Sequence, residues 1–102
     1  MEILTFKYNA TKSVPKHAYI GVVASGDLEI LLEPSKEENA YVVVRTSSDG
    51  FRQTWKSILD RFFSVNNIAV NIEINDFGAT PGMVSMRLLQ VLEVCSIEKT
   101  EG

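Results

Sequence analysis

Between residues 41 and 74 the sequence reads YVVVRTSSDGFRQTWKSILDRFFSVNNIAVNIEI. The β-branched run at its start predicts a strand over residues 41–46. From 51 to 64, apolar side chains recur at helical spacing and predict an amphipathic helix. The apolar stripe of this helix consists of Phe51, Trp55, Ile58, Leu59 and Phe62. The hydroxyls and the acid of residues 46–49 are suited to cap its first turn.

At 68–74 the residues Ile68, Val70, Ile72 and Ile74 alternate with other residues, which is the period of a half-buried strand. Strand, helix and strand in this order favour a right-handed parallel crossover. Trp55 and the phenylalanines fit a hydrophobic core better than a platform for a ligand, because they recur at helical spacing.

Upstream of this unit, alternation predicts a strand at 4–8, and residues 9–16 are polar and predict a loop. Residues 18–23 and 28–33 predict two further strands. The four residues between them, Ala24-Ser25-Gly26-Asp27, are typical of a turn. We therefore expect an antiparallel hairpin here.

Downstream, Thr80 is a suitable N-cap residue, and Pro81 suits the first position of a second helix. The apolar face of that helix comprises Val84, Leu88, Val91, Leu92 and Cys95. Two amphipathic helices require one sheet face to cover. The sequence thus predicts an α+β fold, a two-layer α/β sandwich with a mixed, mostly antiparallel sheet and both helices packed on one face. We expect a single domain at 1–97 and a frayed tail at 98–102.

The composition excludes several classes of function. The 102 residues carry a net charge of −3 with scattered Lys and Arg, which argues against nucleic-acid binding. One cysteine and one histidine leave no metal-binding cluster and no intrachain disulfide. Neither a signal peptide nor an apolar run long enough to cross a bilayer is evident. We expect a cytoplasmic protein without a membrane partner.

Three candidate sites remain, and each has a plainer structural interpretation. The Ser25 hydroxyl is available for modification, because Gly26 leaves room beside it and Asp27 could orient it. The plainer interpretation is an ordinary turn, since turns favour all three residue types. The segment 76–82 leads into a helix N-terminus that could bind an anion or a partner, or simply cap the helix. His17 and Cys95 are weak candidates for a catalytic pair, since no activating third group is evident.

Two stretches resemble a known family. Residues 21–34 read GVVASGDLEILLEP, and residues 75–82 read NDFGATPG, continuing into Arg87, Leu88 and Gln90. Together they are similar to the acyl carrier (delta) subunit of biotin-independent malonate decarboxylase. A more distant likeness is to the acyl carrier subunit of citrate lyase, which shares the Ser-Gly-Asp turn.

The resemblance implies a non-catalytic carrier with a covalent cofactor, 2'-(5''-phosphoribosyl)-3'-dephospho-CoA, joined through a phosphodiester to Ser25. It implies three kinds of partner: a dedicated prosthetic-group transferase, an acetyl/malonyl transferase subunit, and subunits that decarboxylate the malonyl thioester. The arm would carry acetyl or malonyl on its terminal thiol. A citrate-lyase-type carrier, a non-covalent binding or assembly module, and a free-standing enzyme using His17 or Cys95 are the alternatives.

Overall fold

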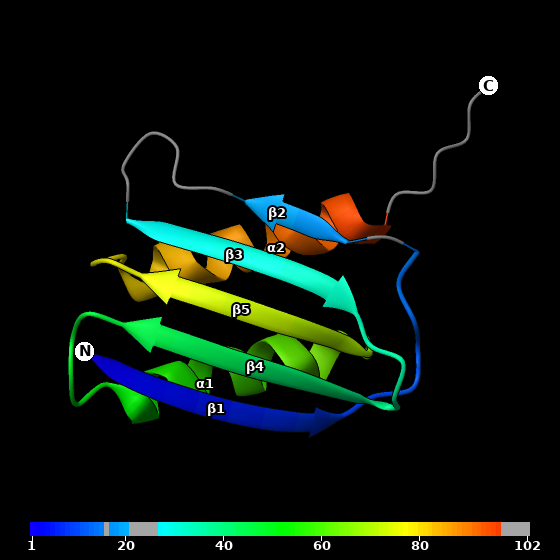
Figure 1. Ribbon diagram of the computed structural model, residues 1–102, viewed down its shortest axis with the longest axis horizontal. Helices are drawn as coiled ribbons and strands as arrows, with labels where there is room; N and C mark the ends of the chain where they lie inside the picture. Colours follow the sequence, from blue (N-terminus) through cyan, green and yellow to red (C-terminus); the bar gives the residue numbers. More distant parts are fainter. Residues whose placement is uncertain (16, 21–26, 97–102) are drawn as a thin grey trace.

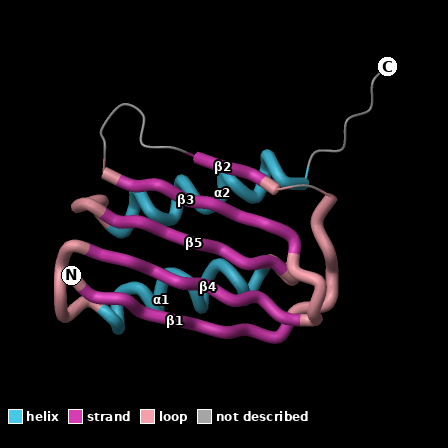
Figure 2. Tube along the Cα trace, viewed as in Figure 1, coloured by secondary structure: helices cyan, strands magenta, loops and turns pink. Residues whose placement is uncertain are grey.

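The computed structural model describes residues 1–15, 17–20 and 27–96. Its elements are β1 (Glu2–Asn9), β2 (Ala18–Ile20), β3 (Leu28–Pro34), β4 (Asn39–Thr46), α1 (Arg52–Val65), β5 (Val70–Asp76) and α2 (Pro81–Ser96). The strands form one sheet and both helices cover the same face of it (Figures 1 and 2). The predicted two-layer α+β architecture is confirmed.

The five-stranded sheet has the order β1-β4-β5-β3-β2. β4 and β5 are parallel, and every other neighbouring pair is antiparallel. The predicted parallel connection through α1 and the antiparallel pairing of β2 with β3 are both confirmed. The described part of β2 ends at Ile20, whereas the sequence predicted a strand over 18–23. Residues 21–26, which hold most of the predicted turn, lie outside the described residues.

Alternating side chains build the core. The register places Leu4 opposite Val44, Val44 beside Ile74, and Ile74 opposite Ile30, so one face of four strands is apolar. All four side chains are buried, and the helices cover them with Trp55, Leu59, Phe62, Val84, Leu88, Val91 and Cys95. The predicted strand at 68–74 begins later and ends later than expected, because pairing with β4 continues to Asp76.

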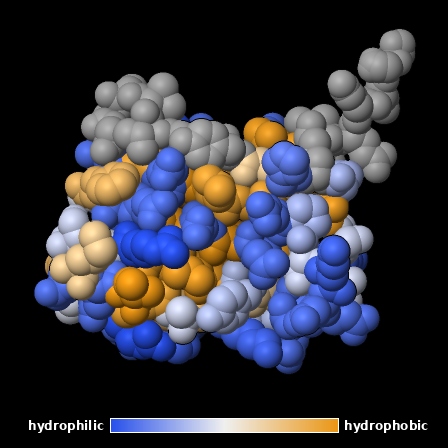
Figure 3. Space-filling model, in the orientation of Figure 1, coloured by the Kyte–Doolittle hydropathy of each residue, from blue (hydrophilic) through white to orange (hydrophobic). Residues whose placement is uncertain are grey.

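No helix formed by the described residues covers the opposite face of the sheet. Figure 3 looks onto this face, where hydrophobic groups lie between hydrophilic ones. Ile3 and Tyr41 are exposed there, and an ion pair joins Arg45 Nη1 to Glu73 Oε2 at 3.1 Å. No helix in the described part of the chain is long and apolar enough to cross a membrane.

The two helix starts differ. α2 begins as predicted, with the Met83 N–H donating to Thr80 Oγ1 at 3.2 Å. The predicted capping of α1 by residues 46–49 is wrong, because its N-cap residue is Phe51 and no side chain caps it. Phe51 is also 51% exposed, so it does not extend the buried stripe of Trp55, Leu59 and Phe62 as expected.

Candidate functional site

One end of the sheet brings together segments that are distant in sequence. Strands β4 and β5 end there, β3 begins there, and both helices start nearby (Figure 1). The Phe77 N–H donates to the carbonyl oxygen of Asp27 at 2.8 Å. Leu28 lies opposite Asp76 in the β3–β5 register. The residue that follows segment 21–26 is therefore tied directly to the loop before α2.

The two segments that carry the family resemblance thus meet at this end. Beyond the Asp27–Phe77 contact, Asn75 Nδ2 donates to Glu29 Oε1 at 2.8 Å across the β3–β5 pair. Nothing in the local sequence predicted this contact, because strand order depends on pairings between distant residues. It defines the candidate functional site as the surface around Asp27 and the β5–α2 loop.

Asp76 is the polar centre of this end of the sheet. Its side chain is only 6% exposed, yet both of its carboxylate oxygens accept hydrogen bonds. Oδ2 accepts from Thr46 Oγ1 at 2.8 Å, and Oδ1 accepts from the N–H groups of Gly78 at 3.1 Å and Ala79 at 2.9 Å. A buried carboxylate costs much free energy unless its oxygens are satisfied. Asp76 therefore holds the β5–α2 loop against the end of β4.

These bonds also decide between the two interpretations of segment 76–82. An anion at a helix N-terminus needs free backbone N–H groups. Here Asp76 already occupies two of the loop amides, and Thr80 occupies the Met83 amide. The geometry favours a self-capped loop over a phosphate site.

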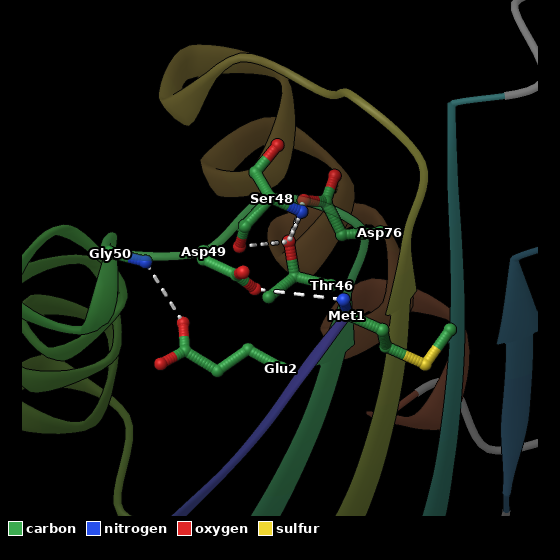
Figure 4. A network of polar contacts seen from close by, with 7 residues as sticks. All are labelled: Met1, Glu2, Thr46, Ser48, Asp49, Gly50 and Asp76. Atoms are coloured by element: carbon green, nitrogen blue, oxygen red, sulfur yellow. Dashed lines mark hydrogen bonds and ion pairs between the residues drawn. The ribbon is translucent and has the colours of Figure 1, made fainter.

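The same carboxylate explains why α1 has no side-chain cap. Thr46, itself 1% exposed, donates to Asp76 and accepts from the Ser48 N–H at 3.1 Å (Figure 4). Asp49 pairs with the N-terminal ammonium group at 3.6 Å. The Thr46 hydroxyl and the Asp49 carboxylate are thus engaged at the sheet end and the N-terminus instead of at the helix start.

The first strand joins this network as well. Glu2 Oε1 accepts a hydrogen bond from the Gly50 N–H at 3.1 Å (Figure 4). Gly50 has φ +87°, a left-handed conformation that glycine adopts without a steric cost. The β4–α1 connection is therefore bound on one side to β5 and on the other to β1.

Of the three residues predicted at the attachment site, the structure describes Asp27. Ser25 and Gly26 lie outside the described residues, so their placement stays a prediction. Asp27 is half-buried, and its backbone carbonyl makes the contact with Phe77. Neighbouring Leu28 is 4% exposed. The described chain next to the predicted site is therefore firmly packed.

His17 and Cys95 do not form a site. His17 is exposed. Cys95 is fully buried, and its Sγ donates to the Leu92 carbonyl at 3.3 Å. A reactive cysteine needs solvent access and an electropositive setting, so Cys95 is a core residue. Within the described residues, no group of His, Cys, Asp or Glu is placed to hold a metal ion.

A hollow of about 310 Å³, which the sequence did not predict, opens beside Asp76. It lies between the starts of the two helices, and its lining includes Phe51, Trp55, Pro81 and Val84. The half-exposed Phe51 is thus one wall of this hollow. Helical periodicity placed Phe51 on the apolar side of the helix, but it could not predict the hollow that Phe51 lines.

Known proteins resemble the chain over nearly its whole length. A family model described as Malonate decarboxylase delta subunit (MdcD) matches residues 15–95. The malonate decarboxylase acyl carrier protein of Stutzerimonas stutzeri (strain A1501) is 46% identical over 94 residues, covering 91% of this chain and 95% of that protein. The protein of the same name from Azotobacter vinelandii (strain DJ / ATCC BAA-1303) is 42% identical over 97 residues, covering 94% and 98%.

A solved structure agrees with these sequence matches. One chain in the crystal structure of a Pseudomonas malonate decarboxylase hetero-tetramer in complex with malonate is similar, with a TM-score of 0.86 and 41% identity. The match covers 93% of this chain and 99% of that chain.

Proposed function

Since the chain belongs to the malonate decarboxylase delta subunit family, we propose that it serves as the acyl carrier of such an enzyme through a prosthetic group attached to Ser25. Its relatives are named acyl carrier proteins, and the similar structure is a chain of a hetero-tetramer. The chain is accordingly a carrier subunit that works with other subunits.

The observation that best supports attachment at Ser25 is the Asp27–Phe77 contact. A tether that is to reach several active sites needs a mobile arm on a firm base. Asp27 lies two residues after Ser25, and its carbonyl is bound by the first amide of the β5–α2 loop at 2.8 Å. Asp76 in turn holds that loop through three hydrogen bonds.

We propose that the attached group is 2'-(5''-phosphoribosyl)-3'-dephospho-CoA, linked by a phosphodiester to the serine hydroxyl. When bound, it would supply a terminal thiol that holds the acyl group. The chain's own residues would provide the hydroxyl of attachment, the support beneath it, and the surface that partners recognise. The partners would be a prosthetic-group transferase, an acetyl/malonyl transferase subunit and decarboxylase subunits.

Intact mass spectrometry tests the attachment. The chain is co-expressed with the transferase that installs the group, and the adduct is located by peptide mapping. We expect one adduct, on the peptide that contains Ser25, and none in the Ser25→Ala variant. Ser47→Ala is the matched control because Ser47 is an exposed serine at the same end of the sheet. It should load fully.

An adduct mapped elsewhere would contradict the attachment at Ser25. The non-covalent alternative predicts that a reconstituted complex is active with an unmodified chain, so the Ser25→Ala chain would support activity there. The carrier proposal expects that complex to be inactive.

A further inference from the structure

A groove runs along α1 and α2 and begins at the end of the sheet where β4 and β5 finish. It consists of three adjoining hollows of about 310, 300 and 200 Å³. The first and second share Thr54, Ile58 and Pro81, and the second and third share Ile58, Arg61 and Ser85. The three hollows therefore follow one another along α1 and α2, and this row is called the groove below.

The groove begins at the candidate functional site. Its first hollow is lined by Thr46 and Asp76, and Asp76 is followed by Phe77, the residue bound to Asp27. The Asp76 carboxylate is committed to hydrogen bonds within the chain. Asp27, two residues after the proposed attachment serine, is therefore bound to the residue that follows one wall of this groove.

The far end of the groove is apolar. Its last hollow is walled by Phe62, Val65, Leu88 and Leu89. Val65 is 77% exposed and Leu89 57% exposed, so these side chains present apolar surface to whatever enters. Burial of such surface is favourable at roughly 25 cal/mol per Å².

Arg61 supplies a cation midway along the groove. It lines the second and third hollows, and it has no ion pair within the part of the chain that the structure describes. The other α1 cations are engaged: Lys56 Nζ lies 2.7 Å from Asp60 Oδ2, and Arg52 stacks 5.0 Å above the Phe6 ring. An uncommitted guanidinium favours phosphate, which it binds through its planar fork of donors.

We propose that this groove is a resting site for the tethered CoA-like arm, with Arg61 contacting a phosphate and the exposed Val65 and Leu89 covering the aliphatic part. The inference rests on the proposed attachment at Ser25. The site combines apolar walls with one charged group, the usual pattern of a small-molecule site. It is open and partly exposed, so the arm binds weakly and can leave for a partner's active site.

Amide NMR spectra of the loaded and unmodified chains test this inference, while intact mass reports loading separately. In the fully loaded chain, we expect shifts at Ile58, Arg61 and Leu89 in addition to those near residue 25. Arg61→Gln should reduce the groove shifts without changing the mass. Arg52→Gln is the matched control, since it removes the same charge from the same helix outside the groove, and it should leave the shifts unchanged.

A second measurement does not depend on attachment. Free coenzyme A is titrated against the unmodified chain, and the same groove amides should shift. Arg61→Gln should weaken the apparent affinity about fivefold, the upper range for a solvent-exposed ion pair. Arg52→Gln should leave that affinity unchanged.

The outcomes separate the two proposals. Complete loading with undisturbed groove amides overturns the resting site and leaves the carrier function intact. No loading contradicts the attachment, and the coenzyme A titration then decides the groove alone. Failure of coenzyme A to shift any groove amide overturns the resting site.

Discussion

Replacing Asp76 with alanine should destabilise the protein by loosening the β5–α2 loop at the end of the sheet. The substitution removes three hydrogen bonds to a carboxylate, from Thr46, Gly78 and Ala79. Hydrogen bonds to charged groups contribute about 1.5–3 kcal/mol each before the partners find other acceptors. Their sum is an upper limit, since such contributions are not additive.

The groups left behind are not equally costly. The Thr46 hydroxyl is buried but also lies 3.3 Å from the Ser48 carbonyl oxygen, which can replace the lost acceptor. The Gly78 and Ala79 amides lie in a part-buried loop that water can reach. We therefore expect a loss of about 3 kcal/mol in the free energy of unfolding, out of the roughly 5–15 kcal/mol typical of a small domain.

Urea denaturation at pH 7 measures this loss, with hydrogen exchange of the Phe77 amide as a local readout. Asp76→Ala should lower the midpoint and speed exchange at Phe77, because the loop that holds this amide against Asp27 is released. Asp49→Ala removes an acid from the same network, 74% exposed and paired with the N-terminus, and should cost less than about 0.5 kcal/mol. A loss below about 1 kcal/mol for Asp76→Ala would refute the argument that this carboxylate anchors the loop.

Three further predictions concern the core, the turns and the pH dependence. Leu59 is fully buried, so Leu59→Ala should lower the free energy of unfolding, measured by urea denaturation, by about 2–5 kcal/mol. Leu89 is 57% exposed, so Leu89→Ala should change it by less than about 0.5 kcal/mol. Equal losses for the two variants would contradict the assigned burial. Gly78→Ala should lower the melting temperature because Gly78 has φ +126°, while Gly82→Ala, in open space in the first turn of α2, should be neutral or stabilising by up to about 1 kcal/mol. Burial and a hydrogen bond to a carboxylate raise the pKa of Tyr8 in the folded state. The free energy of unfolding should therefore be unaffected below the unfolded-state pKa of 10.0 and fall as the pH rises above it. Tyr8→Phe should flatten this alkaline decline, and an unchanged slope would contradict the role of Tyr8.

Local patterns in the sequence were sufficient for most of the fold. Alternating apolar residues predicted the strands, and helical spacing predicted both ends of α1 to within one residue and the apolar face of α2. Thr80 and Pro81 predicted the start of α2, since a cap is a contact between residues three positions apart. The parallel pairing of β4 and β5 followed from the length and amphipathic character of the segment between them.

The candidate site was predictable only in part. Ser25 was singled out by turn chemistry and by family resemblance, and its placement is still a prediction. The failed cap of α1 shows why local reasoning ends here: Thr46 is a good cap residue by type, but its hydroxyl is taken by Asp76, thirty residues away. A local pattern cannot rank competing partners that only the folded chain brings within reach.

The sequence by itself therefore determined the elements, their apolar faces and the two-layer architecture, because these depend on residue periodicities within one segment. The tertiary structure decided that Asp27 meets Phe77, that Asp76 organises the end of the sheet, and that α1 and α2 leave a groove containing Arg61. Each of these depends on the order of strands and on the spacing between helices, which arise from the packing of the whole core.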